Sequence, residues 1–273
     1  MMNVINLLTQ RKPYTATILL LTLLQVTALA QKKIKTLEVS DTIVSAWVDR
    51  PGELYILTKH GQLQKFDANG KVLSLYSDHP APTLFDPHDG SRLFAYFRAT
   101  RQYDLMSPTL QIMQTFTIDS AAAIDPWLAC MAGDYDVWIL DAADWSMKKI
   151  NTRIGSVVAE ELLPAKTGRV KDHSIFMRSY QGFVFLLDTT EGILIFNSVG
   201  KHIKTLPVKN IQYFNFLGEE LYYLEGDKLK FFDLFTAESR EQKLPSTGNS
   251  IALLTDERLF LIRKNTIDIM SIP

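Results

Sequence analysis

The chain has 273 residues, of which 47% are hydrophobic and 22% are charged, as in soluble globular proteins and unlike disordered or collagen-like chains. Its 29 Lys and Arg nearly balance its 30 Asp and Glu, without a basic block. Nucleic acid is therefore excluded as a main partner, because binding to phosphates needs clustered positive charge. The single cysteine, Cys130, excludes an intrachain disulfide and lies in an apolar stretch, where we expect it to be buried.

The first thirty residues differ from the rest of the chain. Arg11 and Lys12 precede an apolar run of about 15 residues that ends in Ala-Leu-Ala, the pattern of a secretory signal with an A-x-A cleavage site. An uncleaved membrane anchor is the alternative, but the run is short for a bilayer span. We therefore predict a signal peptide over residues 1–30 and one folded domain over residues 31–273. We expect the mature protein in the periplasm, at the outer membrane or in the medium, without itself spanning a membrane.

A pattern of two apolar runs, a tight turn and a third run recurs along this domain. Its first copy is LYILTKHGQLQKFDANGKVLSLY, and the six copies start at Leu54, Leu93, Val137, Val184, Leu221 and Leu259. The starts are 39, 44, 47, 37 and 38 residues apart, which is the period of a four-stranded propeller blade. The repeats therefore predict six blades.

A further short apolar run precedes each copy, as IVSAWVD does at residues 43–49. Each unit then has strands A, B, C and D from the inside outward, except the sixth, which ends after its third run at Pro273. Residues 32–40, KKIKTLEVS, form a predicted strand without a unit. We predict an all-β, six-bladed β-propeller whose ring is closed by this N-terminal strand pairing with the last blade, because closure leaves no exposed sheet edge.

Other fold classes fit the pattern less well. A parallel α/β fold is excluded because no stretches of helical period separate the strands. A β-sandwich or a barrel is the alternative, but the regular period favours the propeller. Seven blades would need more residues than the chain has after its signal.

An apolar residue followed by a small polar one closes the second run of every copy. The pairs are Phe66-Asp67, Tyr103-Asp104, Ile150-Asn151, Phe196-Asn197, Phe232-Asp233 and Met270-Ser271. Asp and Asn side chains accept hydrogen bonds from the backbone two residues later and so start turns. We expect these positions to turn the chain and do not count them as ligands.

The copies LYILTKHGQLQKFDANGKVLSLY and VFLLDTTEGILIFNSVGKHIKTLP resemble blades of NHL-type and related six-bladed β-propellers of exported bacterial proteins. The resemblance covers residues 32–273 and rests on structural motifs. It implies the fold. Because such propellers serve as scaffolds, ligand-binding modules, lyases and hydrolases, it implies no single function.

The residues indicate no cofactor and no catalytic group. FDANGKVLSLY is similar to the docking repeat of quinone-cofactor propellers, but it lacks the Trp that packs between blades there. His79, Asp86, His88 and Asp89 form the one cluster that suggests a metal site. His79 precedes strand A of its blade and His88 follows it, so the two imidazoles would lie on opposite faces and could not share an ion. A nucleophile elbow and a Gly-rich phosphate loop are both missing from the sequence.

The remaining candidates lie on the face of the predicted ring where the B–C and D–A connections emerge. The predicted partner-binding residues are His60, Arg98, Arg101, Asp144, Trp145, Lys166, Arg169 and Lys171. Trp145 would be an interface anchor or a packed strand residue. The long connection at residues 162–173 would be a functional loop or a solvated insertion. Trp47 and Trp127, in innermost strands, would line the channel mouth or pack in the core.

Two hypotheses of function follow. A complete ring with an export signal and without a recognisable catalytic constellation favours a non-enzymatic scaffold, or an accessory subunit, that binds a protein or complex of the bacterial cell envelope. The alternative is a carbohydrate-binding propeller, or a metal-dependent hydrolase or lyase, with a small-ligand site at the mouth of the central channel.

Overall fold

The structure, a computed structural model, describes residues 32–77, 80–87, 89–133, 135–166 and 168–272. The predicted signal segment, together with His79 and His88, lies outside the described residues. In the ranges that are described, no helix has the length and hydrophobicity of a bilayer span.

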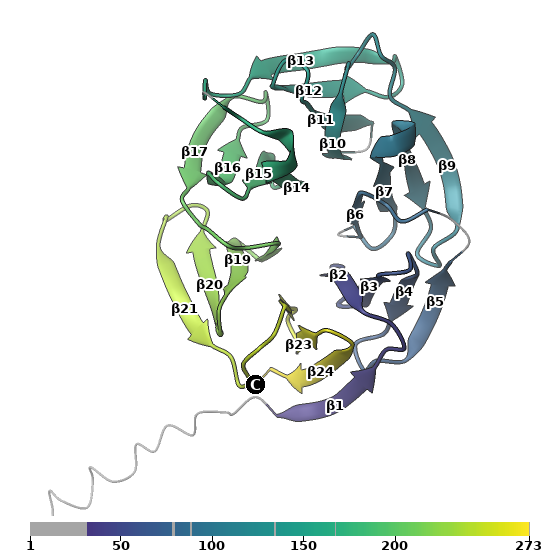
Figure 1. The fold of residues 1–273 in the computed structure, drawn as a ribbon, viewed down its shortest axis with the longest axis vertical. Helices are drawn as coiled ribbons and strands as arrows, with labels where there is room; N and C mark the ends of the chain where they lie inside the picture. The colour runs from purple at the N-terminus through teal and green to yellow at the C-terminus, as the bar shows by residue number, and fades with distance from the viewer. Residues whose placement is uncertain (1–31, 78–79, 88, 134, 167, 273) are drawn as a thin grey trace, which may run out of the picture. The chain divides into compact units, whose positions relative to one another are not determined.

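The described residues form six four-stranded antiparallel sheets, the blades, arranged around a central axis (Figure 1). Blade 1 contains β2 (Ile43–Val48), β3 (Leu54–Thr58), β4 (Leu63–Phe66) and β5 (Val72–Tyr76); blade 2 contains β6 (Leu84–Asp86), β7 (Leu93–Phe97), β8 (Gln102–Met106) and β9 (Ile112–Thr117). Blade 3 contains β10 (Pro126–Met131), β11 (Asp136–Asp141), β12 (Ser146–Asn151) and β13 (Ser156–Leu162); blade 4 contains β14 (Ser174–Tyr180), β15 (Phe183–Asp188), β16 (Gly192–Phe196) and β17 (His202–Leu206). Blade 5 contains β18 (Phe214–Leu217), β19 (Glu220–Glu225), β20 (Lys228–Asp233) and β21 (Ser239–Lys243). The six-bladed, all-β prediction is confirmed.

Blade 6 takes its outer strand from the opposite end of the chain. Its strands are β22 (Ile251–Leu254), β23 (Arg258–Arg263), β24 (Thr266–Ser271) and β1 (Lys33–Glu38), in that order. β1 runs antiparallel to β24, with Leu37 opposite Ile267, and Figure 1 shows the purple first strand beside the yellow last one. The N-terminal segment therefore completes the ring.

The inner strands are buried on both faces. β3, β7 and β16 are buried along their whole length, whereas the outer strands β5 and β9 are mostly exposed. Each inner strand lies between two neighbouring blades, so both of its faces need apolar side chains. This is why the first run of each copy, strand B, reads as a continuous apolar run rather than as an alternating one.

Asp and Asn turn the chain between strands C and D, as the sequence predicts. The Oδ1 atom of Asp67 accepts hydrogen bonds from the backbone N–H groups of Asn69 at 2.9 Å and of Lys71 at 2.8 Å. The same arrangement follows Asn151, Asn197 and Asp233. These residues therefore act in folding, by satisfying backbone donors in the turn.

The equivalent prediction for Asp104 is wrong. Asp104 lies in the middle of β8, is buried, and accepts a hydrogen bond from the Thr115 hydroxyl at 2.6 Å. Ser107 makes the turn instead, because its Oγ accepts the Gln111 N–H at 3.2 Å. The cause is the extra 3-10 turn at residues 98–100, which delays the start of β8 and shifts its end past Asp104.

Gly70→Ala should destabilise the ring closure. The φ angle of Gly70 is 77°, and a Cβ there would lie 2.6 Å from Leu37 Cδ1 in β1 and 2.8 Å from Ile269 Cδ1 in β24. The control, Gly155→Ala, has φ 64° and a Cβ that meets nothing within 4 Å. In urea unfolding we expect Gly70→Ala to lose about 1–3 kcal/mol more than this control. Equal losses would contradict a role of Gly70 in closure.

Candidate functional site

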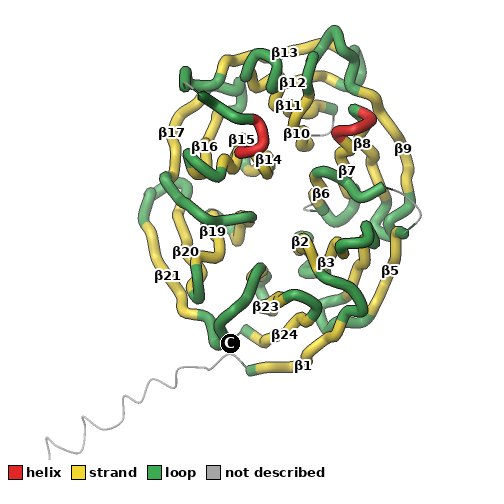
Figure 2. The backbone as a smooth tube through the Cα atoms, in the orientation of Figure 1, coloured by secondary structure: helices red, strands yellow, loops and turns green. Residues whose placement is uncertain are grey.

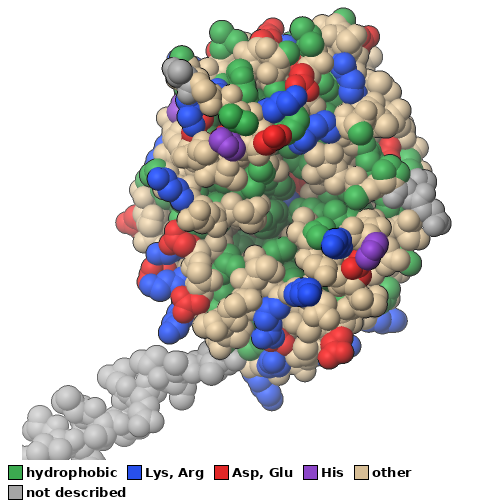
Figure 3. All heavy atoms as spheres, viewed as in Figure 1, with side chains coloured by type: hydrophobic (Ala, Val, Ile, Leu, Met, Phe, Trp, Pro, Cys, Tyr) green, Lys and Arg blue, Asp and Glu red, His purple; other side chains and the backbone are tan. Residues whose placement is uncertain are grey.

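The two faces of the ring carry different connections. In an antiparallel blade, the A–B and C–D turns emerge on one face and the B–C and D–A connections on the other, and we call these the A–B face and the B–C face. Figure 2 views the B–C face, where the short helices η1 (Arg98–Thr100) and η2 (Lys171–His173) lie on either side of the central axis. Figure 3 shows charged side chains of both signs beside one another around a central hollow on this face.

All eight predicted site residues lie in B–C or D–A connections. His60 follows β3, Arg98 and Arg101 follow β7, Asp144 and Trp145 follow β11, and Lys166, Arg169 and Lys171 lie between β13 and β14. The topology therefore brings residues from blades 1 to 4 to one face, but their interactions differ greatly from one residue to the next.

Trp127 lies under two of the predicted cations. The guanidinium carbon of Arg98 is 3.3 Å from the centre of the indole ring and the Lys171 ammonium is 4.7 Å from it. The indole N–H donates to the Ser174 carbonyl at 2.9 Å, and Lys171 also pairs with Asp125 at 2.7 Å. Trp127 is buried, so it packs in the core and carries a cationic cover, a stabilising cation–π arrangement.

Trp145 holds the long connection against the ring. Its φ angle is 58°, and the Arg169 guanidinium lies 5.2 Å from its ring centre. Arg169 and Lys166 each approach the same carboxylate oxygen of Glu191 at 3.2 Å. Three cations of the connection are therefore bound to blades 3 and 4, and the connection is an ordered part of the B–C face rather than a solvated insertion.

Other predicted residues are bound within the protein. Asp144 accepts hydrogen bonds from the backbone N–H and hydroxyl of Ser146 and pairs with Lys148 at 2.9 Å. His60 contacts Asp41 through its ring and its backbone N–H, and these bonds hold the pKa of Asp41 well below its usual range. Arg101 donates to the Ala123 carbonyl. These three residues shape the loops of the face.

Exposed apolar side chains adjoin in sequence the residues that make the Trp145 and Lys171 contacts. Ile124 is 69% exposed, Leu162 is 70% exposed and Val170 is 44% exposed. Leu162 precedes Leu163, whose N–H donates to the Trp145 carbonyl. Val170 lies in the sequence between Arg169, which packs on Trp145, and Lys171. Ile124 precedes Asp125, the ion-pair partner of Lys171. We call Ile124, Trp145, Leu162 and Val170 the blade-3 patch. Sequence reasoning missed its three aliphatic members, because single apolar residues in loops carry no periodic signal.

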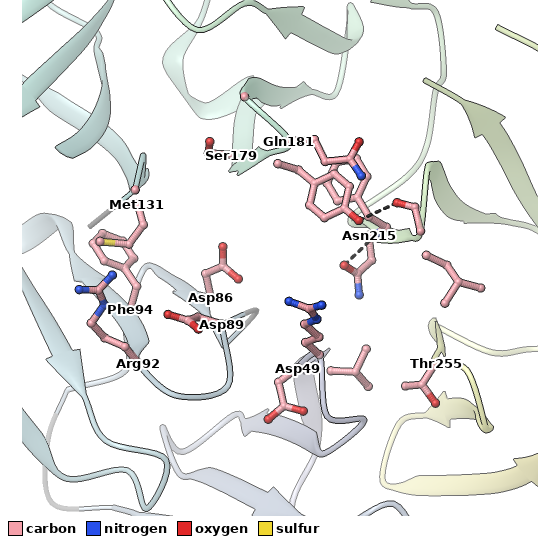
Figure 4. Close-up of a pocket in the computed structure, with 18 of the residues that line it drawn as sticks. Asp49, Asp86, Asp89, Arg92, Phe94, Met131, Ser179, Gln181, Asn215 and Thr255 are labelled. Carbon is pink, nitrogen blue, oxygen red and sulfur yellow. Dashed lines mark hydrogen bonds between the residues drawn. The ribbon is translucent and has the colours of Figure 1, made fainter. Parts of the chain in front are cut away.

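A second candidate site lies on the A–B face, where all six blades contribute to a cavity of about 800 Å³. It is lined by the ends of the innermost strands and the turns that follow them (Figure 4). Blades 1 and 2 supply Asp49, Arg50, Asp86, Asp89 and Arg92, and blades 3 to 5 supply Met131, Tyr180, Asn215, Phe216 and Leu217. None of the eight predicted residues lines this cavity.

Arg178 of β14 lies beside the cavity and joins blades across the axis. It is fully buried, and its guanidinium donates to Asp86 of blade 2 at 2.8 and 3.2 Å and to the Asn215 side chain of blade 5. Burial lowers the pKa of Arg178, but the facing Asp86 carboxylate outweighs that effect and the pKa is raised. Arg178 therefore keeps its positive charge, and the contact with Asp86 compensates that buried charge.

Asp49 is the second buried acid of this region. Its carboxylate accepts the Glu53 N–H at 2.8 Å and the Tyr55 hydroxyl at 2.9 Å. Burial raises the pKa of Asp49 to about 6, against these hydrogen bonds. The carboxyl of Asp49 therefore titrates about one pH unit below neutrality, and its carboxylate is the acceptor in both hydrogen bonds.

Metal ligation has no support from the described ranges, in which no three His, Cys, Asp or Glu side chains come together as ligands. Two residues of the His79–Asp89 sequence cluster are described. Asp86 pairs with Arg178, and Asp89 lines the cavity and accepts a hydrogen bond from the Ser91 hydroxyl at 2.8 Å. Cys130 is buried as predicted, and burial raises the pKa of its thiol. A low-pKa, reactive thiol is therefore not expected there.

The stability of the protein should depend on pH through Asp49. The unfolded pKa of Asp is about 3.9, so the raised folded pKa gives a contribution that is full below pH 4 and is lost as pH rises through 6. Asp49→Asn does not titrate. Relative to this variant, the wild type should therefore lose free energy of unfolding between pH 4 and pH 7, as measured by urea unfolding at each pH. A difference that is constant or grows with pH would contradict the assignment.

Comparisons with known proteins support the fold. No family model matches the chain, and no curated protein matches it. The WD40 domain of Pan2 from Neurospora crassa is similar over 89% of this chain and 95% of its own, with 11% identity and a TM-score of 0.61. BamB from Moraxella catarrhalis is similar over 89% of this chain and 100% of its own, with 8% identity and a TM-score of 0.46. The first likeness shows a β-propeller fold, and the second is too distant to support an argument.

Proposed function

We propose that this chain is an exported, non-enzymatic β-propeller of the NHL-like type that binds a protein partner through the blade-3 patch. It would act as a scaffold or accessory subunit of a bacterial cell-envelope complex, in the periplasm or at the outer membrane. The blade-3 patch is the observation that carries the proposal, and residues 1–30 carry the expectation of export.

The patch has the composition of a protein interface. Three of its members, Ile124, Leu162 and Val170, are exposed aliphatic side chains, and the fourth is the half-buried Trp145. The Lys171–Asp125 ion pair joins the sequence neighbours of Val170 and Ile124. Protein interfaces commonly combine an apolar core, an anchoring Trp and a polar rim. A partner that covers these aliphatic side chains would stabilise the complex through their burial.

The patch is also held rigid before binding. Arg169 packs on Trp145 and pairs with Glu191, and Lys171 pairs with Asp125 while it lies over Trp127. These contacts join the long connection to blades 3 and 4. A preformed surface loses little conformational entropy on association, which favours affinity.

Ile124→Asp should abolish partner capture. The change places a charge in the centre of the patch, at a side chain that is 69% exposed, so the fold should be little affected. The control is Ile154→Asp, because Ile154 is 70% exposed and lies in the C–D turn of the same blade, on the opposite face. In affinity purification from crosslinked envelope extracts, we expect at least a tenfold loss of the recovered partner for Ile124→Asp and none for Ile154→Asp. Equal recovery would reject the patch, and recovery of this chain only would reject the proposed function.

Export should produce a mature chain that begins at Gln31. An A-x-A site at residues 28–30 predicts cleavage at that point. Intact-mass measurement of the protein from the envelope fraction should give the mass of residues 31–273. A full-length chain, or a chain found only in the cytoplasmic fraction, would contradict export by this signal.

A further inference from the structure

We infer that the central cavity on the A–B face binds a neutral saccharide, a ligand site separate from the blade-3 patch. The cavity measures about 800 Å³, within the range of about 300–1,000 Å³ usual for small-ligand sites. Its two halves differ in chemistry, and that difference identifies the class of ligand.

One half of the cavity is aromatic and apolar. Tyr180 and Phe216 line it, and their rings stack at 4.0 Å between centres with an angle of 7°. The Tyr180 hydroxyl donates to the Gly218 carbonyl at 2.6 Å, which fixes the ring pair. Leu217, which follows Phe216 in β18, also lines the cavity, and Met131 lies beside Phe94 at another part of the lining (Figure 4). A sugar ring presents C–H groups on its faces, and these pack on aromatic and aliphatic side chains.

The other half carries charges of both signs. Asp49 and Arg50 come from blade 1, and Asp89 comes from blade 2 (Figure 4). Figure 4 draws Asp49, Asp86 and Asp89 on one side of the space and Gln181 and Asn215, of blades 4 and 5, on the other. The charged residues of blades 1 and 2 and the blade that carries Tyr180 therefore line different sides of one cavity, so a single ligand can contact both.

Mixed charge favours a neutral ligand with many hydroxyl groups. A hydroxyl both donates and accepts hydrogen bonds, so it donates to the carboxylates of Asp49, Asp89 or Asp256 and accepts from the guanidinium of Arg50. An anion such as phosphate would face the carboxylates of Asp49, Asp89 and Asp256, and a polyamine would face the guanidinium groups of Arg50 and Arg92. Asp86 adds no net charge, because Arg178 neutralises it. The saccharide is the ligand whose groups match both walls.

The site is formed before a ligand enters. The turn of blade 2 packs on that of blade 1, since a Cβ on Gly90 would lie 2.8 Å from Pro51 Cδ. A Cβ on Gly52 of blade 1 would lie 3.8 Å from the Cβ of Thr255 of blade 6, so these two turns are also close together. The ion pair of Arg178 and Asp86 fixes blade 4 against blade 2 beside the same cavity. Such interlocked turns hold the lining residues in place, so binding does not have to order them.

Titration of the purified full chain with neutral saccharides tests this inference. The saccharide probes are maltose, cellobiose, lactose and N,N′-diacetylchitobiose. Glycine, inorganic phosphate and spermidine represent the competing ligand classes, and binding is measured by saturation-transfer NMR and calorimetry. We expect saturable binding of at least one saccharide and none of the other three probes. Absence of binding by all four saccharides, or binding of a competing probe instead, overturns the inference.

Variants separate the cavity from the patch. The double variant Arg50→Ala/Asp256→Ala changes two exposed cavity residues and should weaken saccharide binding at least tenfold. Arg153→Ala, an exposed arginine of a C–D turn outside the cavity lining, is the control and should bind as the wild type does. Ile124→Asp should also keep saccharide binding, so loss of the partner and loss of the ligand are independent results. Unchanged binding in the double variant places the saccharide elsewhere and overturns the site.

Discussion

Every inner strand of this ring must be covered on both faces, and no blade meets that requirement by itself. β3 and β7 are buried along their whole length because the neighbouring blades pack against both sides of their sheets. The requirement is met all round the ring only when the last blade also meets the first, and a core cluster joins Ile56 of blade 1 with Phe260 and Ile267 of blade 6. The rest of the molecule, including both candidate sites, is positioned by this closed packing.

The central axis shows how such packing creates a site. The ends of the six innermost strands meet at the axis. The backbone polar groups there need hydrogen-bond partners, so some of the side chains at these ends are polar. Arg178, Asp86 and Asn215 satisfy one another beside the cavity, while Asp49 is left buried with a raised pKa. Asp49, Asp86 and Asn215, the polar residues that the fold must pair with other groups near the axis, also line the cavity.

The repeat, the strand order and the identity of the closing segment were predictable from the sequence, because apolar runs and turn residues are local signals. The face on which Trp145 and Arg169 lie was predictable as well, since it follows from strand order. The cavity was not, because Asp86, Arg178 and Asn215 are far apart in the chain and only the folded ring brings them together. One signal was available: Arg178 is a lone charge in the apolar run HSIFMRS, and a buried charge needs a partner. The error at Asp104 arose because one 3-10 turn shifts a strand without changing its apolar pattern.

The pairing of β1 with β24 sets an order on folding. β1 is the first described strand to leave the ribosome and β24 is the last, so β1 has no partner in its sheet until β24 has been made. Closing a loop that spans nearly the whole chain is entropically costly and slow. Until then the ring stays open and its end blades are only half covered. The interface between blades 1 and 6 therefore forms after every other interface between neighbouring blades, so a destabilising change in β1 or β24 affects the last step of folding rather than the first.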